Sequence, residues 1–294
     1  MDISSIWAFY ANMKGTSMNK QIIELDENRK LKIVDYPGGS QTIIALHGLT
    51  GNNLQLQFYT SLLTPKYHVI AVDFRGRGDS GNADDQSSLW KHAKDIKDLI
   101  AKLEIEDVIL MGYSMGGFVS AIVASEINPR ALILLDGAGE MFDHQRSIVE
   151  PTFSRISSHY NSMEEYVEST VAKYKNMGID DSEELRNAVK YEIACKGDYW
   201  QNKSCEKTIR QDWESFWKFD IKELADKITC PVLLVEATGG IGGPLPLFKP
   251  ESYVLLKKHI KNLVNKVSDA SHYTMVFTER SDINNFILDF LLKI

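Results

Sequence analysis

A serine held between two glycines is the residue of this sequence best suited to chemistry. Ser114 stands at the centre of the pattern Gly-x-Ser-x-Gly, which runs from Gly112 to Gly116. Residues 108–111 are apolar and too few for a helix, so they indicate a buried strand, and residues 118–127 keep the apolar spacing of a helix. A strand, a tight turn and a helix in this order predict a serine hydroxyl raised above the edge of a sheet. Ser114 is therefore the candidate nucleophile.

A serine hydroxyl becomes a good nucleophile only when a neighbouring base accepts its proton. The chain contains seven histidines. His272 lies in a turn, Ser-Asp-Ala-Ser-His-Tyr-Thr, after the last expected strand, whereas His68 opens a strand and four others fall in helical or inserted segments. We therefore expect His272 to be the base. His47, directly after another expected strand, is interpreted as a turn residue.

Apolar strands and helices alternate over most of the chain. A hairpin is expected over residues 18–39, where two alternating segments flank a turn at 26–28. Further strands are expected at 41–46, 67–74, 108–111, 131–136, 231–240 and 265–267. Helices of moderate length separate most of them, which predicts a mostly parallel sheet with helices on both faces. The glycine-rich residues 75–80 are interpreted as a structural crossover turn, and residues 1–17 as a short helix and a loop.

The alternation stops between about residues 137 and 228, where polar helices carry scattered aromatic residues. A run of helices between two strands of one sheet indicates an inserted lid. We expect residues 1–138 and 218–294 to form the core and residues 139–217 to form a helical cap. Some of the cap aromatics are expected to line an apolar pocket over Ser114. These are Tyr199, Trp200, Trp213, Phe216 and Trp217.

Composition limits the partners of this protein. It has 294 residues, 44% hydrophobic and 25% charged, with a formal net charge of −7. That charge opposes binding to nucleic acid or anionic membranes, so a small-molecule substrate is expected. Three cysteines without C-x-x-C spacing argue against a zinc site and a disulfide framework. The first residues lack a basic leader and a long apolar run, which predicts a cytoplasmic protein. The oligomeric state is open, a homodimer included.

Four short motifs give the chain a family resemblance. They are His47-Gly48, residues 73–80, the serine motif and residues 271–273, in that order. With them the chain resembles the α/β-hydrolase fold superfamily over nearly its whole length. The resemblance implies an α/β fold with a mostly parallel eight-stranded sheet, a helical cap after the sixth strand, and no metal or organic cofactor. Lidded relatives include esterases, lactonases, carbon–carbon bond hydrolases, haloalkane dehalogenases and cofactor-free haloperoxidases.

The same resemblance assigns an oxyanion hole. Acyl transfer by a serine needs two backbone N–H donors, one from the residue after the serine and one from the loop after the third strand. In this sequence those residues are Met115 and Leu49. Their side chains are free to line the pocket at the same time.

The acid of the triad departs from the commonest family pattern. Most relatives carry an aspartate several residues beyond the seventh strand, but residues 238–243 read Thr-Gly-Gly-Ile-Gly-Gly. Asp136 closes the sixth strand, where haloalkane dehalogenases and some lactone hydrolases carry their acid, and is our prediction. Glu236, at the end of the seventh strand, is the alternative, and Asp269 beside the histidine turn is a third candidate.

The function expected from these residues is cleavage of a small ester or lactone through an acyl-enzyme on Ser114. A Ser-His-Asp triad would comprise Ser114, His272 and Asp136. Dehalogenation is disfavoured because those relatives use an aspartate as nucleophile. Two alternatives stay open: a serine-triad carbon–carbon hydrolase or perhydrolase, and a non-catalytic receptor on the same fold.

Overall fold

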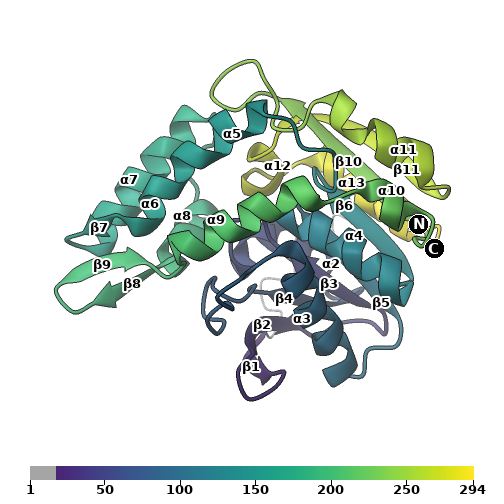
Figure 1. Ribbon diagram of the computed structural model, residues 1–294, viewed down its shortest axis with the longest axis horizontal. Coiled ribbons are helices and arrows are strands. Elements are labelled where there is room, and N and C mark those ends of the chain that lie inside the picture. The colour runs from purple at the N-terminus through teal and green to yellow at the C-terminus, as the bar shows by residue number, and fades with distance from the viewer. Residues whose placement is uncertain (1–17) are drawn as a thin grey trace.

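An eight-stranded, mostly parallel sheet forms the centre of the protein, which a computed structural model describes over residues 18–294 (Figure 1). The helix and loop expected within residues 1–17 lie outside the described residues. The strand order is β1-β2-β4-β3-β5-β6-β10-β11, with only β1 against β2 and β2 against β4 antiparallel. The predicted α/β architecture is confirmed. The strands are β1 (Asn19–Glu24), β2 (Lys30–Tyr36), β3 (Thr42–Leu46), β4 (His68–Val72), β5 (Val108–Tyr113), β6 (Ala131–Leu135), β10 (Val232–Gly239) and β11 (Leu263–Ser271).

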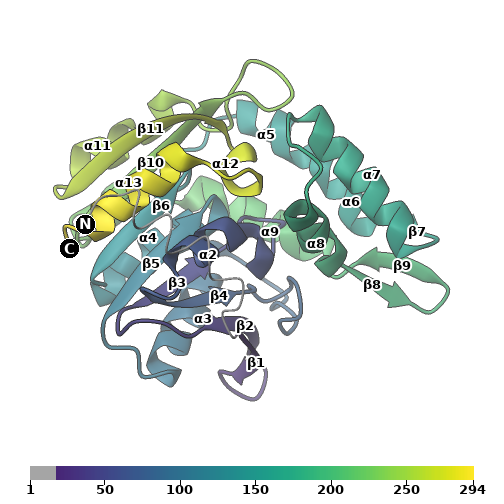
Figure 2. The same cartoon turned by 180° about the vertical axis from the view of Figure 1, so that it is seen from behind.

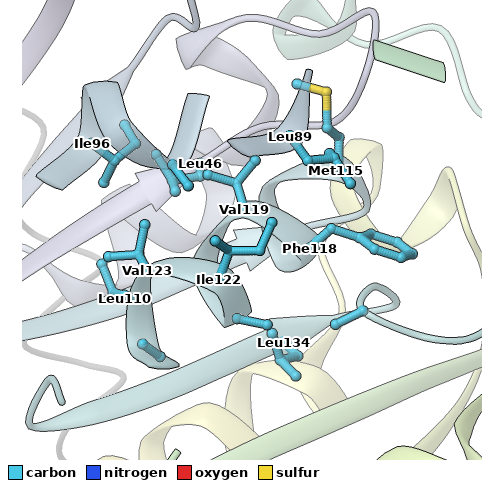
Figure 3. Packing of buried hydrophobic residues seen from close by; sticks show 14 of the residues in the cluster. Leu46, Leu89, Ile96, Leu110, Met115, Phe118, Val119, Ile122, Val123 and Leu134 are labelled. Carbon is cyan, nitrogen blue, oxygen red and sulfur yellow. The ribbon is translucent and has the colours of Figure 1, made fainter. Parts of the chain in front are cut away.

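Helices cover both faces of the sheet, because the inner strands are apolar on both sides. Along β5, Leu110 belongs to the core of one face and Met111 to that of the other. Figure 3 shows the first core, where Leu110 and Leu134 lie near Ile122 of α4. The helices of that face are α3 (Leu89–Lys102), α4 (Met115–Ile127), α10 (Ile221–Ala225) and α11 (Val254–His259). Those of the other face are α2 (Gln57–Leu63), α12 (Thr274–Phe277) and α13 (Ser281–Leu291).

Helix α4, which carries the serine motif at its start, is buried on every side. All residues from Met115 to Ala124 are buried. A helix that is apolar all round needs cover on all faces, and α4 receives it from α3, α10 and the sheet. The serine therefore rests on one of the most enclosed elements of the described chain.

The segment between β6 and β10 projects to one side of the sheet (Figure 2). It is not purely helical, because β7, β9 and β8 pair into a three-stranded antiparallel sheet. These strands have two to four residues, too few for an alternation pattern, and the hairpin turns at Gly197, whose φ is +81°. Its elements are α5 (His144–Val149), η2 (Glu150–Phe153), α6 (Ser154–Ser157), β7 (His159–Tyr160), α7 (Met163–Asn176), α8 (Glu183–Tyr191), β8 (Ile193–Lys196), β9 (Tyr199–Asn202), α9 (Glu206–Ser215) and η3 (Phe216–Lys218).

Two boundaries near the carboxyl end differ from the sequence prediction. The strand expected at residues 265–267 begins earlier, at Leu263, and ends later, at Ser271, where β11 ends. Strand β11 gains this length by pairing with β10 from Leu263 to Ser268 and, after a shift in register, again at Ser271. Across residues 18–294, no helix combines the length and the apolar character needed to cross a lipid bilayer.

Candidate active site

Ser114 lies in a strained turn between β5 and α4. Its φ of 51° and ψ of −119° are unusual for a residue with a side chain and cost on the order of 1–3 kcal/mol. The flanking glycines make the turn possible: a Cβ at Gly112 would lie 2.1 Å from the carbonyl oxygen of Gly116, and one at Gly116 equally close to that of Leu46. The backbone N–H of Ser114 donates to the Leu135 oxygen of β6 at 3.0 Å. These contacts therefore fix the backbone at Ser114, and with it the position of the serine side chain.

The structure brings His272 and Asp136 together. The Nδ1 atom of His272 lies 2.7 Å from Oδ2 of Asp136, although 136 residues separate them in sequence. The Tyr113 hydroxyl donates to the His272 carbonyl oxygen at 2.9 Å and so holds the backbone of the histidine turn. His272 and Ser114 line the same cavity.

The Asp136 carboxylate is held by three donors and is fully buried. Its Oδ1 atom accepts from the Ala237 N–H at 3.1 Å and from the Tyr253 hydroxyl at 2.9 Å, which leaves Oδ2 for His272. Burial and the neighbouring Asp136 charge raise the pKa of the Tyr253 hydroxyl well above its ordinary value, so the tyrosine stays a donor. Asp136 also has a positive φ of 46°. Two of the three predicted triad residues therefore share the left-handed backbone that collects at functional sites.

The other two candidate acids lie elsewhere. Glu236 is buried, but its Oε1 accepts from Nζ of Lys257 on α11 at 2.8 Å. Asp269 is largely exposed and pairs with Arg280. Among the three candidates in the described chain, Asp136 is the one whose carboxylate contacts the imidazole.

His47 fixes the loop that follows β3. Its Nε2 accepts from the Phe74 N–H at 3.1 Å, so the ring proton sits on Nδ1, which donates to the Gly48 oxygen at 2.7 Å. Burial lowers the pKa of His47 to about 3, which keeps the ring neutral. The Gly48 oxygen belongs to the same peptide unit as the Leu49 N–H. The histidine therefore determines which way that N–H points.

The two expected oxyanion donors lie on adjoining loops. The Gly116 N–H donates to the His47 oxygen at 3.0 Å and ties the serine turn to the β3 loop. Within residues 18–294, the N–H groups of Leu49 and Met115 have no hydrogen bond to another part of the protein. Both residues are buried. Buried backbone donors without a partner are rare in folded proteins, so these two are available for a bound oxygen.

The cavity beside Ser114 is small, with a volume of about 40 Å³, and both polar and apolar residues line it. None of its lining residues is Lys, Arg, Asp or Glu. A second cavity of about 440 Å³ adjoins it and shares Thr50, Thr152 and Tyr273. The apolar residues that line the first cavity are Leu49, Met141, Val149, Trp213, Phe216, Leu247 and Phe248.

Two of the five cap aromatics named above line this first cavity, namely Trp213 and Phe216. Tyr199 stacks on His159 at 4.0 Å between ring centres. Trp217 packs against the guanidinium of Arg146. Trp200 lies in β9.

Arg77, within the loop interpreted as a crossover turn, joins the core to the cap. It is buried, its Nε donates to the Leu49 oxygen at 3.0 Å, and its NH2 group donates to Asp212 of α9 at 2.6 Å. His92 approaches the same Asp212 oxygen at 3.0 Å. Burial alone would raise the pKa of Asp212, but His92 and Arg77 lower it below its usual range. No sequence pattern indicated this contact, because it depends on how the segment between β6 and β10 packs against the loop that follows β4.

Comparison with known proteins defines the family. Residues 41–278 match the family model described as alpha/beta hydrolase fold. The chain therefore belongs to the α/β-hydrolase fold family. Within the described residues, no group of three or more His, Cys, Asp and Glu side chains could hold a metal ion.

Individual relatives are distant in sequence. A "Putative non-heme chloroperoxidase" of Synechocystis sp. is 24% identical over 264 residues, which cover 86% of this chain and 92% of that protein. The crystal structure of E-2-(acetamidomethylene)succinate hydrolase has a TM-score of 0.77 at 18% identity and covers 94% of this chain and 99% of its own. An N-acyl homoserine lactonase structure has a TM-score of 0.67 at 17% identity, with 94% and 97% covered. At these identities the structural likeness shows the shared fold alone.

Proposed function

We propose that this protein is a serine hydrolase that cleaves a small ester or lactone, with Ser114 as nucleophile, His272 as base and Asp136 as the acid that orients it. The contact of 2.7 Å between His272 and Asp136, together with the cavity that His272 and Ser114 both line, carries the proposal. Membership of the α/β-hydrolase family supports the hydrolytic reaction.

The proposed reaction follows from which ring nitrogen carries the proton. With Nδ1–H donating to Asp136, Nε2 is free to accept the proton of the Ser114 hydroxyl. The serine oxygen then forms a bond to the carbonyl carbon, and the N–H groups of Leu49 and Met115 stabilise the negative oxygen. The imidazolium returns its proton to the leaving alkoxide. Water, deprotonated by His272, attacks the acyl-enzyme, and the proton then passes back to the serine.

The cavity supports a small, uncharged acyl group. A volume of about 40 Å³ has room for only a few heavy atoms, and a wall without charged side chains offers no partner to an ion. One structural relative is by its name a lactonase, which makes uncharged lactones the class of carbonyl compound to test first.

Labelling with a fluorophosphonate probe tests the nucleophile. We expect the probe to modify wild-type protein at Ser114, Ser114→Ala to lose both the label and ester turnover, and Ser120→Ala to keep both. Ser120 is a matched control because it is a buried serine of the same helix with no part in the proposed reaction. A label that persists in Ser114→Ala would overturn the nucleophile assignment.

Turnover of simple esters and lactones separates the proposal from its alternatives. Hydrolysis by the wild type supports it. Binding of carbonyl compounds without turnover would instead indicate a non-catalytic receptor on this fold. Cleavage of carbon–carbon bonds alone, or acyl transfer to peroxide, would indicate a carbon–carbon hydrolase or a perhydrolase.

A further inference from the structure

One polar side chain on the wall of the active-site cavity has a donor without a partner. Gln145, the second residue of α5, is completely buried and lines the cavity together with Ser114 and His272. Its Nε2 atom makes no hydrogen bond within the described chain. A buried amide donor is unfavourable unless something binds it, so its persistence in the wall indicates a ligand.

The orientation of this amide is fixed by the backbone. The Phe142 N–H donates to Oε1 of Gln145. Exchanging the oxygen and nitrogen would place an NH2 group against that N–H, with two donors facing each other. The free end is therefore the donor, and a group that binds there must be an acceptor.

The surrounding wall limits the acceptor to a neutral one. The cavity has no Lys or Arg among its lining residues, so a buried carboxylate would lack a counter-charge. Met141, Val149 and Trp213 line the same cavity and add no charge to its wall. A ketone or amide oxygen meets both conditions, because it accepts one hydrogen bond and carries no charge.

We propose that Gln145 is a specificity-determining residue that donates a hydrogen bond to a neutral carbonyl oxygen in the acyl part of the substrate, separate from the carbonyl that Ser114 attacks. This inference rests on the proposed function and narrows its substrate class to acyl groups with a second, uncharged carbonyl. A site built to donate to such an oxygen discriminates strongly against analogues that lack it, because the donor is then left unpaired.

Matched pairs of nitrophenyl esters test the inference. Each pair has one ester with a ketone in the acyl chain and one with a methyl branch at the same carbon, and the ketone is moved along the chain from pair to pair. For wild-type protein we expect kcat/KM to favour the ketone ester of the best pair by roughly 10- to 100-fold. The preference should disappear in Gln145→Leu and in Gln145→Glu.

The glutamate variant separates recognition from structure. It keeps an oxygen for the Phe142 N–H but loses the unpaired amide donor. It therefore decides the question even if Gln145→Leu fails to fold. A ketone preference that survives in Gln145→Glu, or a wild type that hydrolyses the esters but discriminates within no pair, would overturn the inference.

A binding measurement keeps this test independent of turnover. In the Ser114→Ala background, calorimetry with the methyl esters of the same pairs should show tighter binding of the ketone compound, and Gln145→Glu should remove the difference. Equal affinities contradict the role of Gln145. If wild-type protein takes up the fluorophosphonate and hydrolyses both members of every pair equally, only the role of Gln145 is wrong. If wild-type protein neither takes up the fluorophosphonate nor hydrolyses the esters, while the ketone compound still binds more tightly, the proposed function is wrong. The role of Gln145 in binding a carbonyl oxygen then stands.

Discussion

The carboxylate that orients His272 can be tested by single-atom changes. In Asp136→Asn, the Ala237 N–H and the Tyr253 hydroxyl still require an oxygen, so the new NH2 group would face His272. The ring must then accept at Nδ1 and carry its proton on Nε2, where it cannot act as a base. We expect kcat to fall by up to roughly ten-thousand-fold, the loss associated with a wrong histidine tautomer.

The matched change at the alternative acid is Glu236→Gln. This glutamate pairs with Lys257 and lies away from the imidazole, so we expect kcat to change by no more than a few-fold. Ester kinetics of the two variants, with circular dichroism to verify folding, make the comparison. A large loss in Glu236→Gln beside a small one in Asp136→Asn would reverse the assignment.

At the residue scale, sequence patterns predict residue types more readily than contacts. The serine motif and the histidine turn are local patterns, so Ser114 and His272 could both be named as candidates from the sequence alone. The choice between Asp136 and Glu236 depends on which strand end faces the histidine, which is a property of strand order. Gln145 could not be predicted at all, since a glutamine near a helix start has no distinctive pattern and its importance comes from an unpaired nitrogen.

Among the secondary-structure elements, long apolar strands and helices with regular spacing were predictable because burial imposes their periodicity. The strands β7, β8 and β9 were not, since strands of two to four residues carry too little pattern. The length of β11 was also missed, because several of its residues face solvent and only its pairing with β10 extends it.

The loop after β3 should make stability depend on pH through His47. The pKa of this ring is about 3 in the folded protein and near 6.5 in the unfolded chain. At pH values between these two pKa values, His47 is protonated in the unfolded chain but neutral in the folded protein. The free energy of unfolding therefore falls as pH falls, by up to about 1.4 kcal/mol per pH unit.

His47→Gln removes the titrating group. Urea denaturation from pH 6.5 to 4.5 should therefore show the stability advantage of wild type over His47→Gln shrinking by about 2 kcal/mol. Other carboxylates titrate in both proteins and cancel in the difference. Parallel curves for the two proteins would show that His47 is protonated in the fold.

For the whole molecule, the attachment of the cap to the core rests partly on a buried ion pair. Arg77 and Asp212 lie in different parts of the chain, and Arg77 also donates to the Leu49 oxygen. We expect Asp212→Ala to lower the free energy of unfolding by about 3–5 kcal/mol, because it leaves a buried guanidinium without its carboxylate.

A double-mutant cycle isolates that coupling. The double variant Arg77→Met, Asp212→Ala should lose less free energy of unfolding than the sum of the losses in the two single variants, because it leaves no buried charge without a partner. Denaturation of the four proteins at one pH measures it. Strict additivity would mean that the two side chains stabilise the protein independently.

The place at which the inserted segment interrupts the chain has an evolutionary consequence. Ser114 and Asp136 precede it and His272 follows it, whereas Gln145, Trp213 and Phe216 lie within it or at its end. The three residues that we propose for bond-breaking and the proposed specificity residue Gln145 thus lie in separate stretches of the sequence. Mutation or recombination confined to the middle stretch can change which molecules are accepted while the atoms assigned to the reaction keep their own supports.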